Sequence, residues 1–189
     1  MNKSANNPSR LPMAKFQIPD HQNINKRLRN FLLKMSRDIS DRGSNNTSGV
    51  SYFNNKWLSQ AQLHKSDNSD LQELVRFAEE TANKVFRSPD PDLVISTTAM
   101  WSIVSKAGLT GSRHNHAGRV SGAYYVDAGS SGEADGGLMQ FYQQPESAIP
   151  SHQFKPEAGC LLLFSSSLEH SVSAYSGSKP RIVISLNMR

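Results

Sequence analysis

The sequence contains only one cysteine, Cys160, and no apolar run long enough to cross a membrane. A single cysteine excludes a disulfide framework and a cysteine-rich metal site within this chain. No pattern typical of a secretory signal peptide is present either. We therefore expect a cytoplasmic protein without a membrane partner, in which Cys160 acts as a small buried hydrophobic residue.

The sequence also lacks a cluster of basic residues interleaved with aromatic ones. Its formal net charge is +5, but the lysines and arginines are scattered, apart from a locally basic stretch at residues 15–42. This distribution is typical of a solvated surface and argues against binding to nucleic acid. With 189 residues, of which 37% are hydrophobic, the chain fits one folded domain. The composition indicates no particular oligomeric state.

The first half of the chain has the period of two amphipathic helices. Apolar residues at spacings of three and four predict one helix over residues 21–40. A second apolar stripe predicts a helix that begins near residues 67–70 and continues to Val85. Residues 13–19 favour a short strand, and residues 44–68 are predicted to form a loop.

Beyond residue 91 the period changes to that of β-strands, with glycine and proline between them. Strands are predicted at residues 93–95, 100–104, 120–126, 138–142, 160–164, 170–175 and 181–188. The last two are predicted to form a hairpin, whereas residues 145–156 are predicted to be a connection. Short strands preceded by two helices indicate a mainly β protein, a sandwich or barrel with helices on one face.

Three histidines and one arginine form a pattern that is typical of a metal site. In an extended segment His114 and His116 point to the same side, because residues two apart share a face. His170, in a later predicted strand, can complete one face of the site. Imidazole suits iron, zinc, copper and nickel. Arg181, which follows His170 along the chain, offers a planar fork that matches a carboxylate.

The segment from about residue 100 to residue 189 contains a series of motifs: Trp101, Gly108, His114-Asn115-His116, Ser121-Gly122-Ala123-Tyr124-Tyr125-Val126, Gly159-Cys160-Leu161-Leu162-Leu163-Phe164, Leu168-Glu169-His170-Ser171-Val172, and Arg181 to Asn187. Together these motifs resemble those of the Fe(II)/2-oxoglutarate-dependent oxygenases, and more closely those of a bacterial and phage group within them. The chain departs from the group at residues 144–146, Gln-Pro-Glu, where the group often has Asp-Pro-Arg.

The resemblance implies a double-stranded β-helix, or jelly roll, as the fold of residues 91–189. Residues 1–189 are then one domain, in which residues 15–90 form a helical support region and residues 1–14 are poorly ordered. It also implies that Fe(II) and 2-oxoglutarate are the cofactors and dioxygen a cosubstrate. The expected reaction is hydroxylation of a small molecule or a peptide side chain, with release of succinate and carbon dioxide.

The resemblance assigns the Fe(II) ligands to His114, His116 and His170, although two histidines and one carboxylate are more common in such sites. Asp127 is the alternative carboxylate. Arg181 is expected to pair with the distal carboxylate of 2-oxoglutarate, together with the second tyrosine of the Tyr-Tyr pair, Tyr125. Ser185 and Asn187 are weaker candidates, because they share a strand face with Arg181; that face lies opposite Ile182, Ile184 and Leu186.

Two other functions remain open from the sequence. Three histidines with an open fourth position also describe zinc enzymes that activate water. A non-catalytic binding module on a jelly-roll scaffold is the other alternative, because fold does not dictate function. Arg181 separates the oxygenase from the zinc enzyme, because a hydrolytic zinc site needs no partner for a carboxylate.

Overall fold

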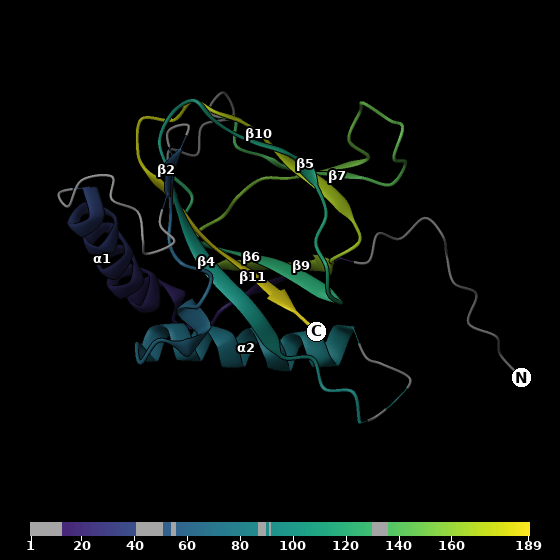
Figure 1. The fold of residues 1–189 in the computed structure, drawn as a ribbon, viewed down its shortest axis with the longest axis horizontal. Coiled ribbons are helices and arrows are strands. Elements are labelled where there is room, and N and C mark those ends of the chain that lie inside the picture. Colours follow the sequence, from purple (N-terminus) through teal and green to yellow (C-terminus); the bar gives the residue numbers. More distant parts are fainter. Residues whose placement is uncertain (1–12, 41–50, 54–55, 87–89, 91, 130–135) are drawn as a thin grey trace, which may run out of the picture.

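In the computed structural model the chain forms two antiparallel β-sheets that face each other, and two helices cover the outer side of the larger sheet (Figure 1). The structure describes residues 13–40, 51–53, 56–86, 90, 92–129 and 136–189. The predictions for residues 1–12 and 44–50 fall outside this part of the chain. Within it, no helix has both the length and the apolar character that a membrane crossing requires.

Both predicted helices are present. Helix α1 (His21–Ser40) and helix α2 (Ser69–Val85) bury apolar stripes that include Leu28 and Leu74. The side chain of Asn68 caps α2 by accepting hydrogen bonds from two backbone N–H groups of the first turn. The apolar stripes pack against the larger sheet, so the helices form a layer that supports it (Figure 1).

The larger sheet has seven strands in the order β1-β9-β6-β11-β4-β3-β2. Their bounds are β1 (Met13–Gln17), β2 (Ser51–Phe53), β3 (Lys56–Leu58), β4 (Thr97–Ser105), β6 (Val120–Asp127), β9 (Cys160–Ser165) and β11 (Arg181–Met188). The smaller sheet has four strands in the order β5-β10-β7-β8. Their bounds are β5 (Leu109–His114), β7 (Met139–Tyr142), β8 (His152–Phe154) and β10 (Glu169–Tyr175).

Strand β11 lies in the middle of the larger sheet, between β6 and β4, and has two different faces. Ile182, Ile184 and Leu186 belong to the apolar cluster on the helix side. Val183 belongs to a second cluster, which lies between the two sheets and includes residues from β6, β7 and β9. The face of β11 that carries Arg181 therefore looks into the space between the sheets, as its alternation predicted.

The predicted hairpin of residues 170–175 and 181–188 is wrong. Strand β10 pairs with β5 and β7, whereas β11 pairs with β4 and β6. The chain between Tyr175 and Arg181 thus crosses from the smaller sheet to the larger one. His170 and Arg181 consequently start from opposite walls of the molecule, rather than from adjacent strands.

The predicted strand at residues 93–95 is also absent, and β4 begins at Thr97. The backbone of Ile95 bonds instead to the side chain of Asn83 on α2. The N–H of Ile95 donates to Asn83 Oδ1 at 2.8 Å, and its carbonyl accepts from Asn83 Nδ2 at 2.8 Å. A side-chain amide therefore satisfies the backbone groups that a neighbouring strand would otherwise pair.

Two segments predicted to be irregular contain short strands. The predicted loop at residues 44–68 contributes β2 and β3 to the larger sheet, followed by a 3-10 turn, η1 (Leu63–Lys65). The predicted connection at residues 145–156 contains β8, which pairs with β7. Strands β2 and β3 therefore come from the part of the chain expected to be a helical support region. Strand β1 confirms the short strand predicted at residues 13–19, although it begins within the part expected to be poorly ordered.

Candidate metal centre

The three predicted histidines converge between the two sheets. His114 ends β5, and His170 on β10 is its direct cross-strand partner. His116 lies two residues beyond the end of β5, where its backbone N–H donates to the carbonyl of Ser166 at 2.9 Å. One ligand nitrogen from each of the three rings lies within 4.8 Å of the others. This is the only such group of metal-ligating side chains in the described part of the chain.

Backbone carbonyls determine which nitrogen of two of these rings is free to bind a metal. His114 Nδ1 lies 2.7 Å from the carbonyl oxygen of Ser112, and His170 Nδ1 lies 3.0 Å from that of Leu168. A carbonyl can only accept, so in each ring Nδ1 carries the hydrogen and Nε2 carries the free lone pair. Such outer contacts orient histidine ligands in metal sites.

Burial keeps two of the rings neutral. His170 is 3% exposed, and burial lowers its pKa to about 4. Burial, followed by the proximity of His114, also lowers the pKa of His116. Neutral imidazole is the form that binds metal. His114 is exposed, so the cluster extends from a buried ring to one in contact with solvent.

Aromatic rings enclose the buried side of the cluster. The ring of Phe164 lies 4.8 Å from that of His170, and Phe141 lies 6.2 Å from it. Trp101 on β4 approaches His116 edge-on at 6.1 Å. The residues around the cluster thus limit its access to water on the buried side and leave the His114 side open.

An ion pair on the outer face of the smaller sheet lies directly behind two of the histidines. Arg113 precedes His114, Glu169 precedes His170, and the two charged side chains pair across β5 and β10. Arg113 also lies over the ring of Tyr142, 4.0 Å from its centroid. Its guanidinium donates to the backbone carbonyls of residues 144, 145 and 147. Sequence analysis missed this pair, although both members alternate with a predicted ligand.

Arg181 lies in the interior, and one of its donors has no acceptor among the residues that the structure describes. It is 3% exposed, and burial lowers its pKa. Its Nη1 donates to the carbonyl of Gly137 at 2.6 Å, whereas its Nε has no hydrogen-bond partner. Gly137 has a φ of 69°, and a Cβ there would lie 2.5 Å from Nη1, so this contact requires glycine.

Tyr125 accompanies Arg181 in the same interior. The Arg181 Cζ atom lies 5.4 Å from the centroid of the Tyr125 ring. Burial raises the pKa of Tyr125 to about 12, although the nearby guanidinium opposes this shift. The Tyr125 hydroxyl is buried and also lacks a hydrogen-bond partner. The Arg181 Nε and the Tyr125 hydroxyl are therefore two buried donors without acceptors in the same interior. A bound carboxylate can accept hydrogen bonds from both.

The remaining predicted residues have different surroundings. Asp127 forms an ion pair with Arg29 of α1 at 2.9 Å, so its carboxylate is committed to the helix layer. Asn187 Oδ1 accepts a hydrogen bond from Ser121 on the neighbouring strand at 2.9 Å. Ser185 is half-buried on the same face of β11. The structure brings neither Ser185 nor Asn187 into hydrogen bonding with Arg181.

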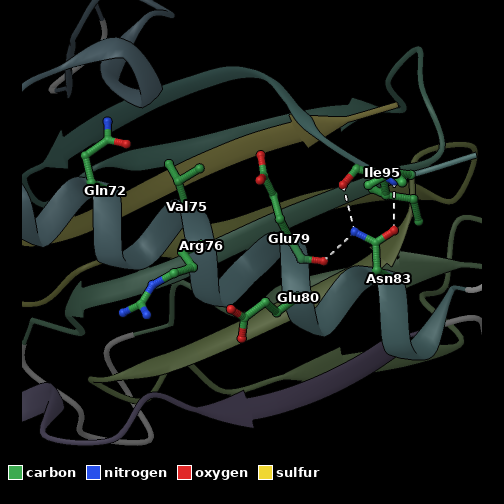
Figure 2. Close-up of a pocket in the computed structure, with 8 residues that line it drawn as sticks. Gln72, Val75, Arg76, Glu79, Glu80, Asn83 and Ile95 are labelled. Atoms are coloured by element: carbon green, nitrogen blue, oxygen red, sulfur yellow. Dashed lines mark hydrogen bonds between the residues drawn. The ribbon is translucent and has the colours of Figure 1, made fainter.

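A groove lies away from the histidines, along α2. Figure 2 shows this groove, of roughly 590 Å³, between α2 and residues 94–95. Asn83 on its wall bonds to the backbone of Ile95, and Glu79 Oε1 accepts from the N–H of Thr97 at 2.7 Å. These hydrogen bonds attach the segment at the start of β4 to α2.

Solved structures share the arrangement of sheets and helices. A prolyl-4-hydroxylase from Pseudomonas putida superposes with a TM-score of 0.63 at 12% identity, covering 95% of this chain and 92% of its own. A viral collagen prolyl hydroxylase from Paramecium Bursaria Chlorella virus-1, in a complex with 2OG, gives 0.64 at 12% identity, covering 94% and 95%. HygX from Streptomyces hygroscopicus, with nickel and 2-oxoglutarate bound, gives 0.60 at 9% identity, covering 93% and 82%.

These similarities establish the fold class, mainly antiparallel β-sheets with few helices, as in the 2-oxoglutarate-dependent oxygenases. A family model also matches the second half of the sequence. Residues 99–187 match the family model described as "Putative 2OG-Fe(II) oxygenase". The resemblance predicted from the sequence is thereby confirmed for this part of the chain. No curated protein matches the chain.

Proposed function

We propose that the protein is an Fe(II)/2-oxoglutarate-dependent dioxygenase. The observation that carries the proposal is the combination of a three-imidazole cluster with a buried guanidinium between the same two sheets. The cluster offers ligand nitrogens within 4.8 Å of one another, and the guanidinium retains an unpaired Nε. A metal beside a buried carboxylate-binding arginine is the pairing that 2-oxoglutarate requires.

The donor set fits Fe(II). His114, His116 and His170 are the proposed ligands, each through one nitrogen, and imidazole is a good ligand for this metal. In His114 and His170 the Nδ1 hydrogen is bonded to a backbone carbonyl, so Nε2 is the nitrogen that can bind the metal. The alternative ligand, Asp127, is less suitable because its carboxylate already pairs with Arg29. The proposed site is therefore formed by three neutral groups, rather than by two histidines and a carboxylate.

The interior also fits the distal carboxylate of 2-oxoglutarate. Arg181 and Tyr125 both present buried donors, and a charge-assisted hydrogen bond is about twice as strong as a neutral one. These residues would bind and orient the cosubstrate, while Phe141 and Phe164 exclude water from the buried side of the metal. Ser185 and Asn187 remain proposed wall residues of the same pocket.

The metal and its cosubstrate supply the oxidising chemistry when bound, and the protein supplies binding and orientation. The proposed overall reaction consumes dioxygen, 2-oxoglutarate and a C–H group. One oxygen atom enters succinate as carbon dioxide leaves, and the other enters the hydroxylated product. Small molecules and peptide side chains are the proposed substrates. The two facing sheets support assigning residues 91–189 to a double-stranded β-helix.

The burial of Arg181 favours this function over a hydrolytic zinc enzyme. Holding a guanidinium at 3% exposure costs desolvation, and a water-activating zinc site gains nothing from that cost. The convergence of three imidazoles favours an enzyme over a metal-free binding module, because such a module has no use for a cluster of metal-ligating side chains.

Spectroscopy of the anaerobic protein tests the proposal. Addition of Fe(II) and 2-oxoglutarate should produce a weak visible charge-transfer band in the wild type and none in His170→Ala. A screen of candidate substrates should then find one that stimulates succinate release in air. A wild-type protein that gives no band and binds Zn(II) without affinity for 2-oxoglutarate would contradict the proposed function.

A further inference from the structure

We propose that Ser105 is a third hydrogen-bond donor of the pocket that receives the distal carboxylate. This inference deepens the proposed function and rests on it. Ser105 ends β4 and is 1% exposed, and its hydroxyl is buried without a hydrogen-bond partner. Buried hydroxyl groups are normally paired, so an orphaned one is available to a ligand that reaches it.

Strand register places this hydroxyl beside the arginine. Ser105 and Arg181 are direct cross-strand partners between β4 and β11. Directly opposed residues project from the same face of a sheet with Cβ atoms about 4.5–5.5 Å apart. The Ser105 side chain therefore points into the space between the sheets, as that of Arg181 does.

The neighbourhood of Ser105 is suited to an anion. On its other side Ser105 pairs with Lys56 of β3, so two cationic side chains start from the same row of the larger sheet. Neither cation can accept a hydrogen bond, because Lys and Arg are donors only. The Ser105 hydroxyl can thus donate to a carboxylate that Arg181 Nε also contacts.

The inner face of β4 also becomes more enclosed toward this end. Trp101 and Ile103, which share the face with Ser105, are half-buried, whereas Ser105 is buried. Trp101 lies near His116, and Ser105 lies beside Arg181. The buried end of the strand is therefore the end at which the proposed cosubstrate would place its distal carboxylate.

Ser102 provides a matched control on the same strand. Its side chain is 0% exposed, and its hydroxyl is buried without a partner, as in Ser105. It projects from the opposite face, since Met100 and Val104 of the same parity belong to the cluster on the helix side. Burial and lack of a partner are thus alike in the two serines, and only their position relative to Arg181 differs.

The test measures dissociation constants on the anaerobic Fe(II) protein for two ligands. One is 2-oxoglutarate, and the other is 2-oxopentanoate, in which a methyl group replaces the distal carboxylate. Ser105→Ala should weaken 2-oxoglutarate about tenfold or more, as expected for a hydrogen bond to a charged group. It should leave 2-oxopentanoate binding unchanged, and Ser102→Ala should leave both constants unchanged. If Ser105→Ala does not fold, Ser105→Cys, which keeps the shape of the side chain with a slightly larger atom but donates weakly, should show the same selective loss.

Two results would overturn the proposal for Ser105. One is an unchanged constant for 2-oxoglutarate in Ser105→Ala. The other is an equal weakening of both ligands, which would indicate a packing effect rather than a contact with the distal carboxylate. A wild-type protein that binds Fe(II) but not 2-oxoglutarate would overturn the proposed function itself, and with it the role of Ser105.

Discussion

Replacing Arg181 with methionine is the sharpest test of the anion pocket. Methionine approximates the length and apolar stem of arginine but removes every donor. Within the described part of the chain the guanidinium donates to the carbonyl of Gly137, and no carboxylate there pairs with it. Methionine leaves that carbonyl without a donor, which lowers the free energy of unfolding. It also removes the desolvation cost of a buried cation, which raises the free energy of unfolding, so the two effects oppose each other.

The effect on cosubstrate binding is not offset in this way. Losing one partner of a buried, hydrogen-bonded charge pair costs about 2–5 kcal/mol, much of it from the carboxylate left without a partner. At about 1.4 kcal/mol per factor of ten, the dissociation constant of 2-oxoglutarate should rise roughly 30- to 4,000-fold. Fe(II) binding should remain nearly intact, because Arg181 is not among the clustered metal-ligating side chains.

Calorimetric titration of 2-oxoglutarate into the anaerobic Fe(II) protein measures this effect, and titration of Fe(II) alone provides the control. An unchanged dissociation constant for 2-oxoglutarate in Arg181→Met would remove Arg181 from the pocket. Equal losses of metal and cosubstrate binding would show instead that the substitution disturbs the whole space between the sheets.

Substitutions at three further residues test the metal centre and its support. His170→Ala should abolish stoichiometric iron binding, measured by metal analysis after desalting. The control His152→Ala, on exposed β8, should retain the iron. Iron retained in His170→Ala would contradict the three-histidine site. His116→Ala should lower the affinity for iron, and full iron affinity in this variant would exclude His116 as a ligand. A metal bound by neutral ligands and a dianionic cosubstrate should favour each other's binding by about 1–3 kcal/mol. His116→Asp should reduce this coupling. Arg113→Ala should lower the free energy of unfolding by about 1–3 kcal/mol and weaken metal binding, because it removes a partly buried ion pair and three bonds to carbonyls. Arg76→Ala, at an exposed pair, should do neither, and equal stability of the two variants would argue against the supporting role of Arg113.

The sequence predicted those features that depend on local periodicity. The apolar spacing over residues 21–40 gave α1 with its observed bounds, because one amphipathic face is enough to define a helix. The alternation along residues 181–188 likewise predicted which side chains of β11 share a face with Arg181. The same parity argument placed His114 and His116 together, although His116 lies beyond the end of β5.

Pairing between distant strands could not be predicted from the same patterns. The five residues between Tyr175 and Arg181 resemble a hairpin loop, yet β10 and β11 belong to different sheets. Ser105 was missed for the same reason, because its significance depends on pairing with Arg181 across β4 and β11. At residues 93–95 a β-branched pattern was overridden by the Asn83 side chain, a contact that no local period reveals.

The two faces of β11 separate the consequences of mutation along a single strand. Even-numbered positions such as Ile184 contribute to the cluster under the helices, so changes there should be tolerated only when they conserve apolar volume. Odd-numbered positions such as Ser185 face the space between the sheets and contribute little to that cluster. A lineage that acquires a new substrate can therefore vary positions such as Ser185, while Arg181 continues to serve the cosubstrate and the even-numbered residues continue to hold the domain together.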